Sequence, residues 1–385
     1  MFSRRWFRAG HSSVKHWRNF DFQLVGIPLG LVTFSVFVLL AISRWSTSGV
    51  SVGTPLRQAI YALLGLTLLI ALTNFDYRLL RPLAVPLFGL NLGLLAVVLL
   101  LGRSVYGAQR WINVGLLPLQ PSEPAKLLLV IVLAKFFSDR EEHIHEVGTV
   151  AKSLLLALVP IGMVLVQPDL GTSAVFVAIW VGMALMAGVR ASHLAALLAV
   201  CLATLPLAWA VMSRVKKFHY MQDRLTIFLH PEKDPLGQGY NVIHSQITVG
   251  SGGFLGHWWG AGTQSQLGLL RVEDKDFIFS VIAEQVGFVG ICLLFAVFIV
   301  LLMRIARVSF MSGDAYGRLL ASGVLSMLMF QVFVNVGMNI GMMPVTGIPL
   351  PLLSYGGSSL ITTLASFGIL QSILLRHQKL VFAHG

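Results

Sequence analysis

Charged residues are scarce in this sequence. Asp, Glu, Lys and Arg make up 11% of the 385 residues, while hydrophobic residues make up 56%, and the mean hydropathy is +0.79. Soluble proteins carry about 25% charged residues. So low a charge content excludes a soluble protein and predicts a polytopic membrane protein.

Acidic residues are the scarcer of the two signs. The chain has 16 Asp and Glu against 28 Lys and Arg, which gives a formal net charge of +12. In a soluble chain such an excess would suggest a nucleic-acid partner. In a membrane protein, basic residues flank the spans and orient them, so we expect no nucleic-acid partner.

Cysteine and the common catalytic motifs are also nearly or wholly missing. The two cysteines, Cys201 and Cys292, lie in apolar runs away from any Cys-x-x-Cys or Cys/His cluster. We expect them to be small core residues and not a disulfide or a metal site. The sequence has no Gly-x-Ser-x-Gly elbow, Walker loop, His-Glu-x-x-His motif or tight carboxylate cluster, which excludes the reactions that depend on them.

Ten segments are apolar and long enough to cross a hydrocarbon core of about 30 Å. They are 22–42, 58–75, 83–101, 121–137, 152–167, 170–188, 193–212, 277–303, 318–340 and 358–375. The first follows a basic leader and is too long for a typical signal-peptide core, so we expect it to stay uncleaved. The predicted fold is all-α, with a transmembrane domain over 22–375.

The distribution of basic residues predicts the orientation. An even number of spans puts both termini on one side, where the short connections carry fifteen basic residues against five on the other side. The N-terminus (1–21) and the tail (376–385) are therefore expected in the cytoplasm. The one long connection, 213–275, then lies on the outer face, and its basic and aromatic start at 214–224 predicts a helix lying at the headgroups.

Asp276 is the last acid before a long apolar segment. A carboxylate at such a place usually marks chemistry, ion passage or a structural pair. The start of a helix favours its ionised form, whereas the neighbouring Phe277 and Phe279 favour the neutral form. These opposed effects suit a general base, which must be ionised and still basic. Glu284, two turns further on, is expected to be buried and to need a donor.

Three other spans begin on the outer face with polar residues. Glu123 and Lys126 are three residues apart and are expected to form an ion pair on one helix face. Asp169 follows Gln167-Pro168 and is expected to cap the helix that it begins. The glycines and hydroxyls of Ser354–Ser359 fit either an anion cradle at a helix start or a tight turn. In the long connection, Lys217 and Arg224 either belong to the headgroup helix alone or also bind a lipid-linked phosphate.

A set of motifs, taken in order along the ten spans, resembles the SEDS family of bacterial wall proteins. The motifs are Gln120-Pro-Ser-Glu-Pro-Ala-Lys126, Gln167-Pro-Asp-Leu-Gly-Thr172, Asp234-Pro-Leu-Gly-Gln-Gly-Tyr240, Gly262-Thr-Gln-Ser-Gln266, Asp276-Phe-Ile-Phe279 and Pro349-Leu-Pro-Leu-Leu-Ser-Tyr-Gly-Gly-Ser-Ser359. The resemblance covers nearly the whole chain. Gly262–Gln266 and Val345–Pro351 are more similar to the elongation branch, RodA, than to the division branch, FtsW.

This resemblance implies a peptidoglycan glycosyltransferase that polymerises lipid II at the outer face of the bacterial cytoplasmic membrane. The family's essential aspartate corresponds to Asp276, the implied base for the acceptor 4-hydroxyl, with undecaprenyl pyrophosphate leaving and inversion at the anomeric carbon. The residues expected to bind substrate or pyrophosphate are Arg110, Glu123, Lys126, Asp169, Lys217, Arg224, Gln264, Ser265, Gln266, Ser354, Tyr355 and Ser358. A divalent cation (Mg or Mn) is left open as a cofactor. The implied partners are a class B penicillin-binding protein and the elongation machinery.

Two departures from the family pattern bear on these expectations. Arg271-Val-Glu-Asp-Lys275 replaces the usual residues before the aspartate, which makes Asp274 a rival base. Gly256-His-Trp258 stands where the family often has Gly-Lys-Gly, so a cationic contact there is weaker or depends on the protonation of His257. Two other functions stay open: a lipid flippase, which would place polar groups near the bilayer midplane, and a scaffold that only recruits a partner.

Overall fold

The structure is a computed structural model, and it describes residues 19–45, 50–101, 103–105, 108–114, 117–214, 219–235, 237–258, 260–270 and 273–377. Each of the ten apolar segments forms a helix. These helices are α2 (Phe22–Trp45), α3 (Thr54–Asn74), α4 (Leu80–Leu101), α5 (Ser122–Ser138), α6 (Val147–Val166), α7 (Leu170–Ala187), α8 (Ala191–Arg214), α12 (Ile278–Met311), α13 (Ala315–Asn339) and α14 (Gly357–Leu375). The all-α membrane fold predicted from hydropathy is confirmed.

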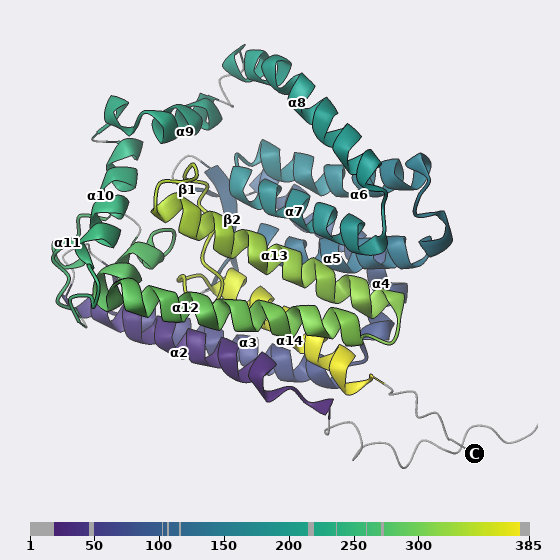
Figure 1. The fold of residues 1–385 in the computed structure, drawn as a ribbon, viewed down its shortest axis with the longest axis horizontal. Helices are drawn as coiled ribbons and strands as arrows, with labels where there is room; N and C mark the ends of the chain where they lie inside the picture. Colours follow the sequence, from purple (N-terminus) through teal and green to yellow (C-terminus); the bar gives the residue numbers. More distant parts are fainter. Residues whose placement is uncertain are drawn as a thin grey trace, which may run out of the picture.

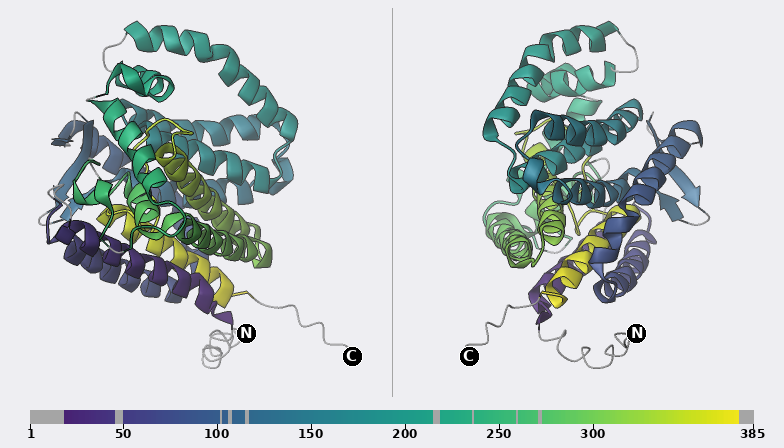
Figure 2. Two further views of the ribbon diagram at one scale, coloured as in Figure 1. Left: turned by 60° about the vertical axis from the view of Figure 1, so that its left-hand side comes forward. Right: turned by 90° about the vertical axis from the view of Figure 1, so that its right-hand side faces the viewer.

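Within the described ranges, eight of these helices are long and apolar enough to cross a membrane. The other two fall short for different reasons. Helix α5 has 17 residues, or about 26 Å at the rise of an α-helix. In α8 the apolar stretch among the residues whose side chains the structure describes is Ala191–Thr204, and the sequence itself continues apolar to Met212. Figures 1 and 2 show α8 standing apart from the bundle. The division into ten spans therefore stays a prediction.

The two ends of the described chain meet. The side-chain amide of Asn19 donates a hydrogen bond to the carbonyl of His377 at 3.2 Å. In Figure 1 these ends lie at one end of the bundle, while the connection between α8 and α12 lies at the opposite end. This agrees with an even number of crossings, and the compartment that each end faces stays a prediction.

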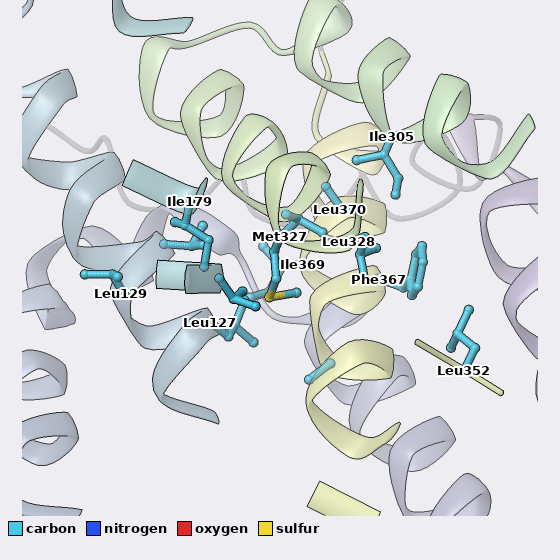
Figure 3. Close-up of a cluster of buried hydrophobic side chains, with 14 of the residues drawn as sticks. Leu127, Leu129, Ile179, Ile305, Met327, Leu328, Leu352, Phe367, Ile369 and Leu370 are labelled. Carbon is cyan, nitrogen blue, oxygen red and sulfur yellow. The ribbon is translucent and has the colours of Figure 1, made fainter. Parts of the chain in front are cut away.

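The core lies around α13 and α14. Helix α13 packs against α12, α7 and α5, and α14 packs along α3. Because α14 is surrounded, nearly all of its side chains are buried, whereas α3 and α4 expose most of theirs. Figure 3 shows buried apolar side chains from α5, α7, α13 and α14: Leu127, Leu129, Ile179, Met327, Leu328, Ile369 and Leu370.

The segment between α4 and α5 differs from the prediction. It contains three short antiparallel strands in the order β1 (Arg103–Val105), β2 (Ala108–Val114), β3 (Leu117–Leu119). In the register, Ser104 faces Gln109 and Ile112 faces Leu119. The β-branched and aromatic residues of this short stretch favour strands, and hydropathy over a span-length window does not register so short a sheet.

The long connection is largely helical. It contains α9 (His219–Leu229), the 3-10 turn η5 (Pro231–Lys233), α10 (Gln238–Ser251) and α11 (Thr263–Gln266). Of the headgroup helix predicted at 214–224, Arg214 is the last residue of α8, residues 215–218 lie outside the described residues, and the part from His219 onward lies in α9. The expectation of two core cysteines is wrong: Cys201 and Cys292 are both unpaired and exposed on their helices. Apolar residues of a membrane protein can face lipid, so an apolar run does not imply burial.

Candidate active site

Asp276 lies two residues before α12, and α12 starts at the end of the bundle opposite the start of α2 and the end of α14 (Figure 1). Its side chain is partly exposed, so packing does not seal it off. Two buried asparagines of α13 hold its backbone: Asn335 Nδ2 and Asn339 Nδ2 donate to the carbonyl of Asp276 at 3.1 and 3.0 Å. The backbone that carries the carboxylate is therefore fixed to the central helix.

The same asparagines join two other segments to this point. Asn335 Nδ2 also donates to the carbonyl of Ile348 at 2.8 Å, and Asn339 Oδ1 accepts from Ser280 Oγ at 2.6 Å. The carboxylate lies beside Gly347, where a Cβ would be 3.6 Å from Asp276 Oδ2. Gly347 has a φ of 75°, a conformation that glycine adopts readily, so glycine permits the turn that passes Asp276.

The turn before α14 is bonded directly to the residues before Asp276. Tyr355 N donates to the carbonyl of Asp274 at 2.8 Å, and Ser354 Oγ donates to the carbonyl of Lys275 at 2.6 Å. From the other side, Gln58 Nε2 of α3 donates to the carbonyl of Ser354 at 3.2 Å. Ser354 and Tyr355, both predicted from sequence, thus lie next to the predicted base.

The predicted ion pair of α5 is confirmed and buried. Lys126 Nζ lies 2.7 Å from Glu123 Oε2, with side-chain exposures of 2% and 4%. Helix α5 is tied to α14 because the backbone N–H of Gln120 donates to Ser358 Oγ at 3.0 Å. The Glu123–Lys126 pair therefore lies at the start of α5, next to the turn before α14 that bonds to the backbone of residues 274 and 275.

Helices α7 and α9 both contact the loop of residues 345–348, which passes beside Asp276. Asp169 caps α7 as predicted, accepting from Thr172 N at 3.1 Å. At Gly171 a Cβ would be 2.7 Å from the carbonyl of Thr346, so the start of α7 packs against this loop. Arg224 of α9 donates to the carbonyl of Val345 at 2.8 Å. Arg224 thus supports the loop, whatever else it binds.

The α11 motif makes contact with Glu284. The carboxylate of Glu284, which is fully buried, accepts from Gln264 N at 2.8 Å and from Ser265 N at 3.1 Å. The sequence predicted that Glu284 needs a hydrogen-bond donor without identifying it. The donors are the backbone N–H groups of Gln264 and Ser265, two residues predicted to bind the substrate. Gln266 uses its side-chain amide to donate to the carbonyl of Gly260.

Asp274, the rival base, differs from Asp276 in its surroundings. Burial raises the pKa of Asp274 above its ordinary value, and the neighbouring Lys275 acts in the opposite direction. Its backbone is engaged by Tyr355, as described above. A raised pKa makes a carboxylate a stronger base, so this shift does not separate the two acids. The choice of Asp276 follows from the Asp276-Phe-Ile-Phe279 motif and stays a prediction.

Two predicted binding residues cannot be placed. Lys217 and the side chain of Arg110 lie outside the described residues. The described part of the chain has no group of three or more His, Cys, Asp or Glu that could hold a metal ion, and a divalent cation stays open as a cofactor.

Sequence reasoning missed the residues that hold the site in place. Asn335, Asn339 and Gln58 are fully or almost fully buried, and each bonds to a backbone carbonyl of the site. A signal was present, because buried amides inside apolar spans are costly unless they find partners. The spacing of Asn335 and Asn339 also places both on one helix face.

The fold and this site define a polytopic membrane protein with a partly exposed acid at one end of its helical bundle. The chain belongs to the FtsW/RodA/SpoVE family of cell cycle proteins, whose profile matches residues 21–379. Membership confirms the resemblance read from the motifs.

Several relatives are similar over nearly their whole length. The peptidoglycan glycosyltransferase MrdB of Escherichia coli K12 is 36% identical, over 94% of this chain and 95% of the relative. The peptidoglycan glycosyltransferase RodA of Treponema pallidum is 32% identical, over 93% and 98%.

Solved structures support the same family. One chain comes from a study of the structural coordination of polymerization and crosslinking by a peptidoglycan synthase complex. It has a TM-score of 0.77 and 36% identity, with coverage of 92% of this chain and 97% of the other. The rod shape determining protein RodA of Thermus thermophilus gives 0.69 and 32%, with coverage of 94% and 99%.

Proposed function

We propose that this protein is a RodA-type peptidoglycan glycosyltransferase, which polymerises lipid II into β-1,4-linked glycan strands during cell elongation. The two relatives that are named for this activity match the present chain over nearly their full length. One observation within the chain carries the proposal further. The acid that the motifs single out, Asp276, is partly exposed at a bundle end, on a backbone held by two buried amides.

In the proposed reaction, Asp276 accepts the proton of the 4-hydroxyl of the acceptor sugar. That oxygen forms a bond to the anomeric carbon of the donor, and the bond from this carbon to the pyrophosphate breaks. The electron pair leaves with undecaprenyl pyrophosphate, and the configuration inverts. A fixed backbone matters because a general base must stay within hydrogen-bond distance of the proton that it removes.

The pyrophosphate that departs needs positive charge or N–H donors. Lys126 is a candidate, although its pairing with Glu123 at 2.7 Å compensates part of its charge. The start of α14 near Ser358 is a second candidate, because a helix N-terminus attracts anions. Arg224 and Arg110 remain predicted contributors. A Mg or Mn ion would take ligands from the phosphates as well as from the protein.

The proposed setting follows from the topology. The Asp276 end of the bundle faces the outside of the bacterial cytoplasmic membrane, and both termini face the cytoplasm. A class B penicillin-binding protein is the proposed partner, which crosslinks the strands, and a similar chain in a complex that polymerises and crosslinks supports this assignment.

The direct test supplies the purified protein, alone and with its transpeptidase, with fluorescent lipid II and separates the products by gel electrophoresis. We expect a ladder of glycan polymer. If the wild-type protein makes no polymer under either condition, the proposed function is wrong. Transport of lipid II across vesicles without polymer would identify a flippase.

A further inference from the structure

Helix α12 is interrupted near the site, and the interruption is filled by a loop. Gly287, inside α12, has a φ of 66° and a ψ of −171°, which is not helical. The N–H groups of Phe288 and Val289 therefore bond outside the helix, to the carbonyls of Gly253 and Phe254 at 2.9 and 3.1 Å. The first two turns of α12, which begin beside Asp276, thus form a separate short segment joined to the loop after α10.

Glu284 lies near the end of this short segment. Its backbone and its side chain both bond to the stretch that runs from the end of α10 to α11. Its backbone carbonyl accepts from His257 N at 3.0 Å. Its carboxylate accepts from two backbone N–H groups of α11, Gln264 and Ser265, and more weakly from Ser251 Oγ at 3.5 Å. Hydrogen bonds from backbone N–H groups to a buried carboxylate are among the stronger ones in proteins.

The fit between Glu284 and α11 leaves no spare space. A Cβ added at Gly262 would lie 2.4 Å from the Glu284 carboxyl carbon. Gly262 has an extended backbone (φ −67°, ψ 124°), so the backbone angles do not call for glycine, but a larger residue would force the Glu284 carboxylate and α11 apart. This close approach sets the distance between α11 and the helix that follows Asp276.

We propose that Glu284 is a positioning residue for substrate binding: it holds the Gly262–Gln266 segment in register with Asp276. The inference rests on the proposed function and on the expectation from the sequence that Gln264, Ser265 and Gln266 bind the substrate. Glu284 lies eight residues after Asp276, which is about 12 Å along a helix, so it does not act on the reacting atoms. Asp276 keeps its own anchors on α13 when Glu284 is changed.

The first experiment measures hydrogen exchange at α11 in the full-length protein. Glu284→Gln offers one acceptor and two donors where the carboxylate offers acceptors only, so one of the two α11 N–H groups loses its partner. We expect exchange in the peptide containing Gln264 and Ser265 to rise about ten-fold or more. Ser251→Ala, which removes only the weakest contact, is the matched control and should leave exchange unchanged.

The second experiment separates KM from kcat in lipid II polymerisation. We expect Glu284→Gln to raise KM about ten-fold and to change kcat less than about two-fold, because a binding segment is displaced while the base stays in place. Gly262→Ala keeps the carboxylate but pushes α11 away, and should give the same pattern. Its control is Gly250→Ala, since a Cβ at Gly250 meets nothing within 4 Å.

The possible outcomes distinguish the two proposals. Unchanged exchange at Gln264 and Ser265, or a loss of kcat at constant KM, would overturn the role given to Glu284. If Glu284→Gln fails to fold, Gly262→Ala decides the matter by the same two measurements. A wild-type protein that makes no polymer overturns the proposed function, and the exchange data then decide only whether Glu284 fixes α11.

Discussion

Replacing Asn339 by Ala should damage activity more than stability. Asn339 Nδ2 donates to the carbonyls of Asp276 and Asn335 at 3.0 and 2.8 Å, and Asn339 Oδ1 accepts from Ser280 Oγ at 2.6 Å. At about 1 kcal/mol for each hydrogen bond, the loss in the free energy of unfolding is about 2–3 kcal/mol. Domains are stable by about 5–15 kcal/mol, so the variant should still fold.

The effect on catalysis has a different origin. Without Asn339, the carbonyl of Asp276 keeps one of its two side-chain donors, Asn335 at 3.1 Å, and the turn before α12 becomes freer to move. A misplacement of about 1 Å at a catalytic group can lower the rate about 100-fold. We therefore expect kcat for lipid II polymerisation to fall by about ten- to a hundred-fold, measured beside thermal unfolding in the same detergent.

Asn91 provides the matched control. It is a fully buried asparagine on α4, and neither of its side-chain polar atoms has a hydrogen-bond partner among the described residues. Asn91→Ala should leave kcat near the wild-type value. The reasoning is refuted if Asn339→Ala polymerises normally, or if Asn91→Ala loses as much activity.

Two further predictions concern charged groups of the site. Lys126→Met leaves Glu123 buried and unpaired and should lower the free energy of unfolding by about 3–5 kcal/mol. The double variant Lys126→Met, Glu123→Gln should recover most of this lost stability. Equal melting temperatures for the single and double variants would contradict the prediction. Because burial raises the pKa of Asp274, its contribution to stability is present below its ordinary pKa of 3.8 and is lost as the pH rises through the raised value. Asp274→Asn should therefore match or exceed the wild-type melting temperature at pH 7, and the difference should shrink toward pH 4. A variant that melts below the wild type at pH 7 would show that the ionised form of Asp274 stabilises the fold.

Local rules were enough to predict the helices and the contacts made within one turn. The ten apolar segments form helices. The three-residue spacing of Glu123 and Lys126 gives the observed ion pair, and Asp169 caps its helix. Each of these features depends on residues near one another in the sequence, so period, spacing and helix-end chemistry determine it.

Contacts between distant segments could not be predicted in the same way. The partners of Glu284 lie 19 and 20 residues before it, and Asn335 and Asn339 bond to a carbonyl 59 and 63 residues away. The exposed cysteines show a related limit. In a bilayer both the core and the lipid-facing surface are apolar, so hydrophobicity does not say which side of a helix is buried.

The central claim is that the carboxylate of Asp276 removes the acceptor proton, and an isosteric pair of variants tests it most directly. Asp276→Asn keeps the backbone carbonyl that Asn335 and Asn339 hold, so the fold should be preserved. Polymerisation of lipid II should then fall by about 100- to 10,000-fold, the usual contribution of a general base, while Asp274→Asn stays close to wild type. Normal polymerisation by Asp276→Asn, together with loss of activity in Asp274→Asn, would contradict the account.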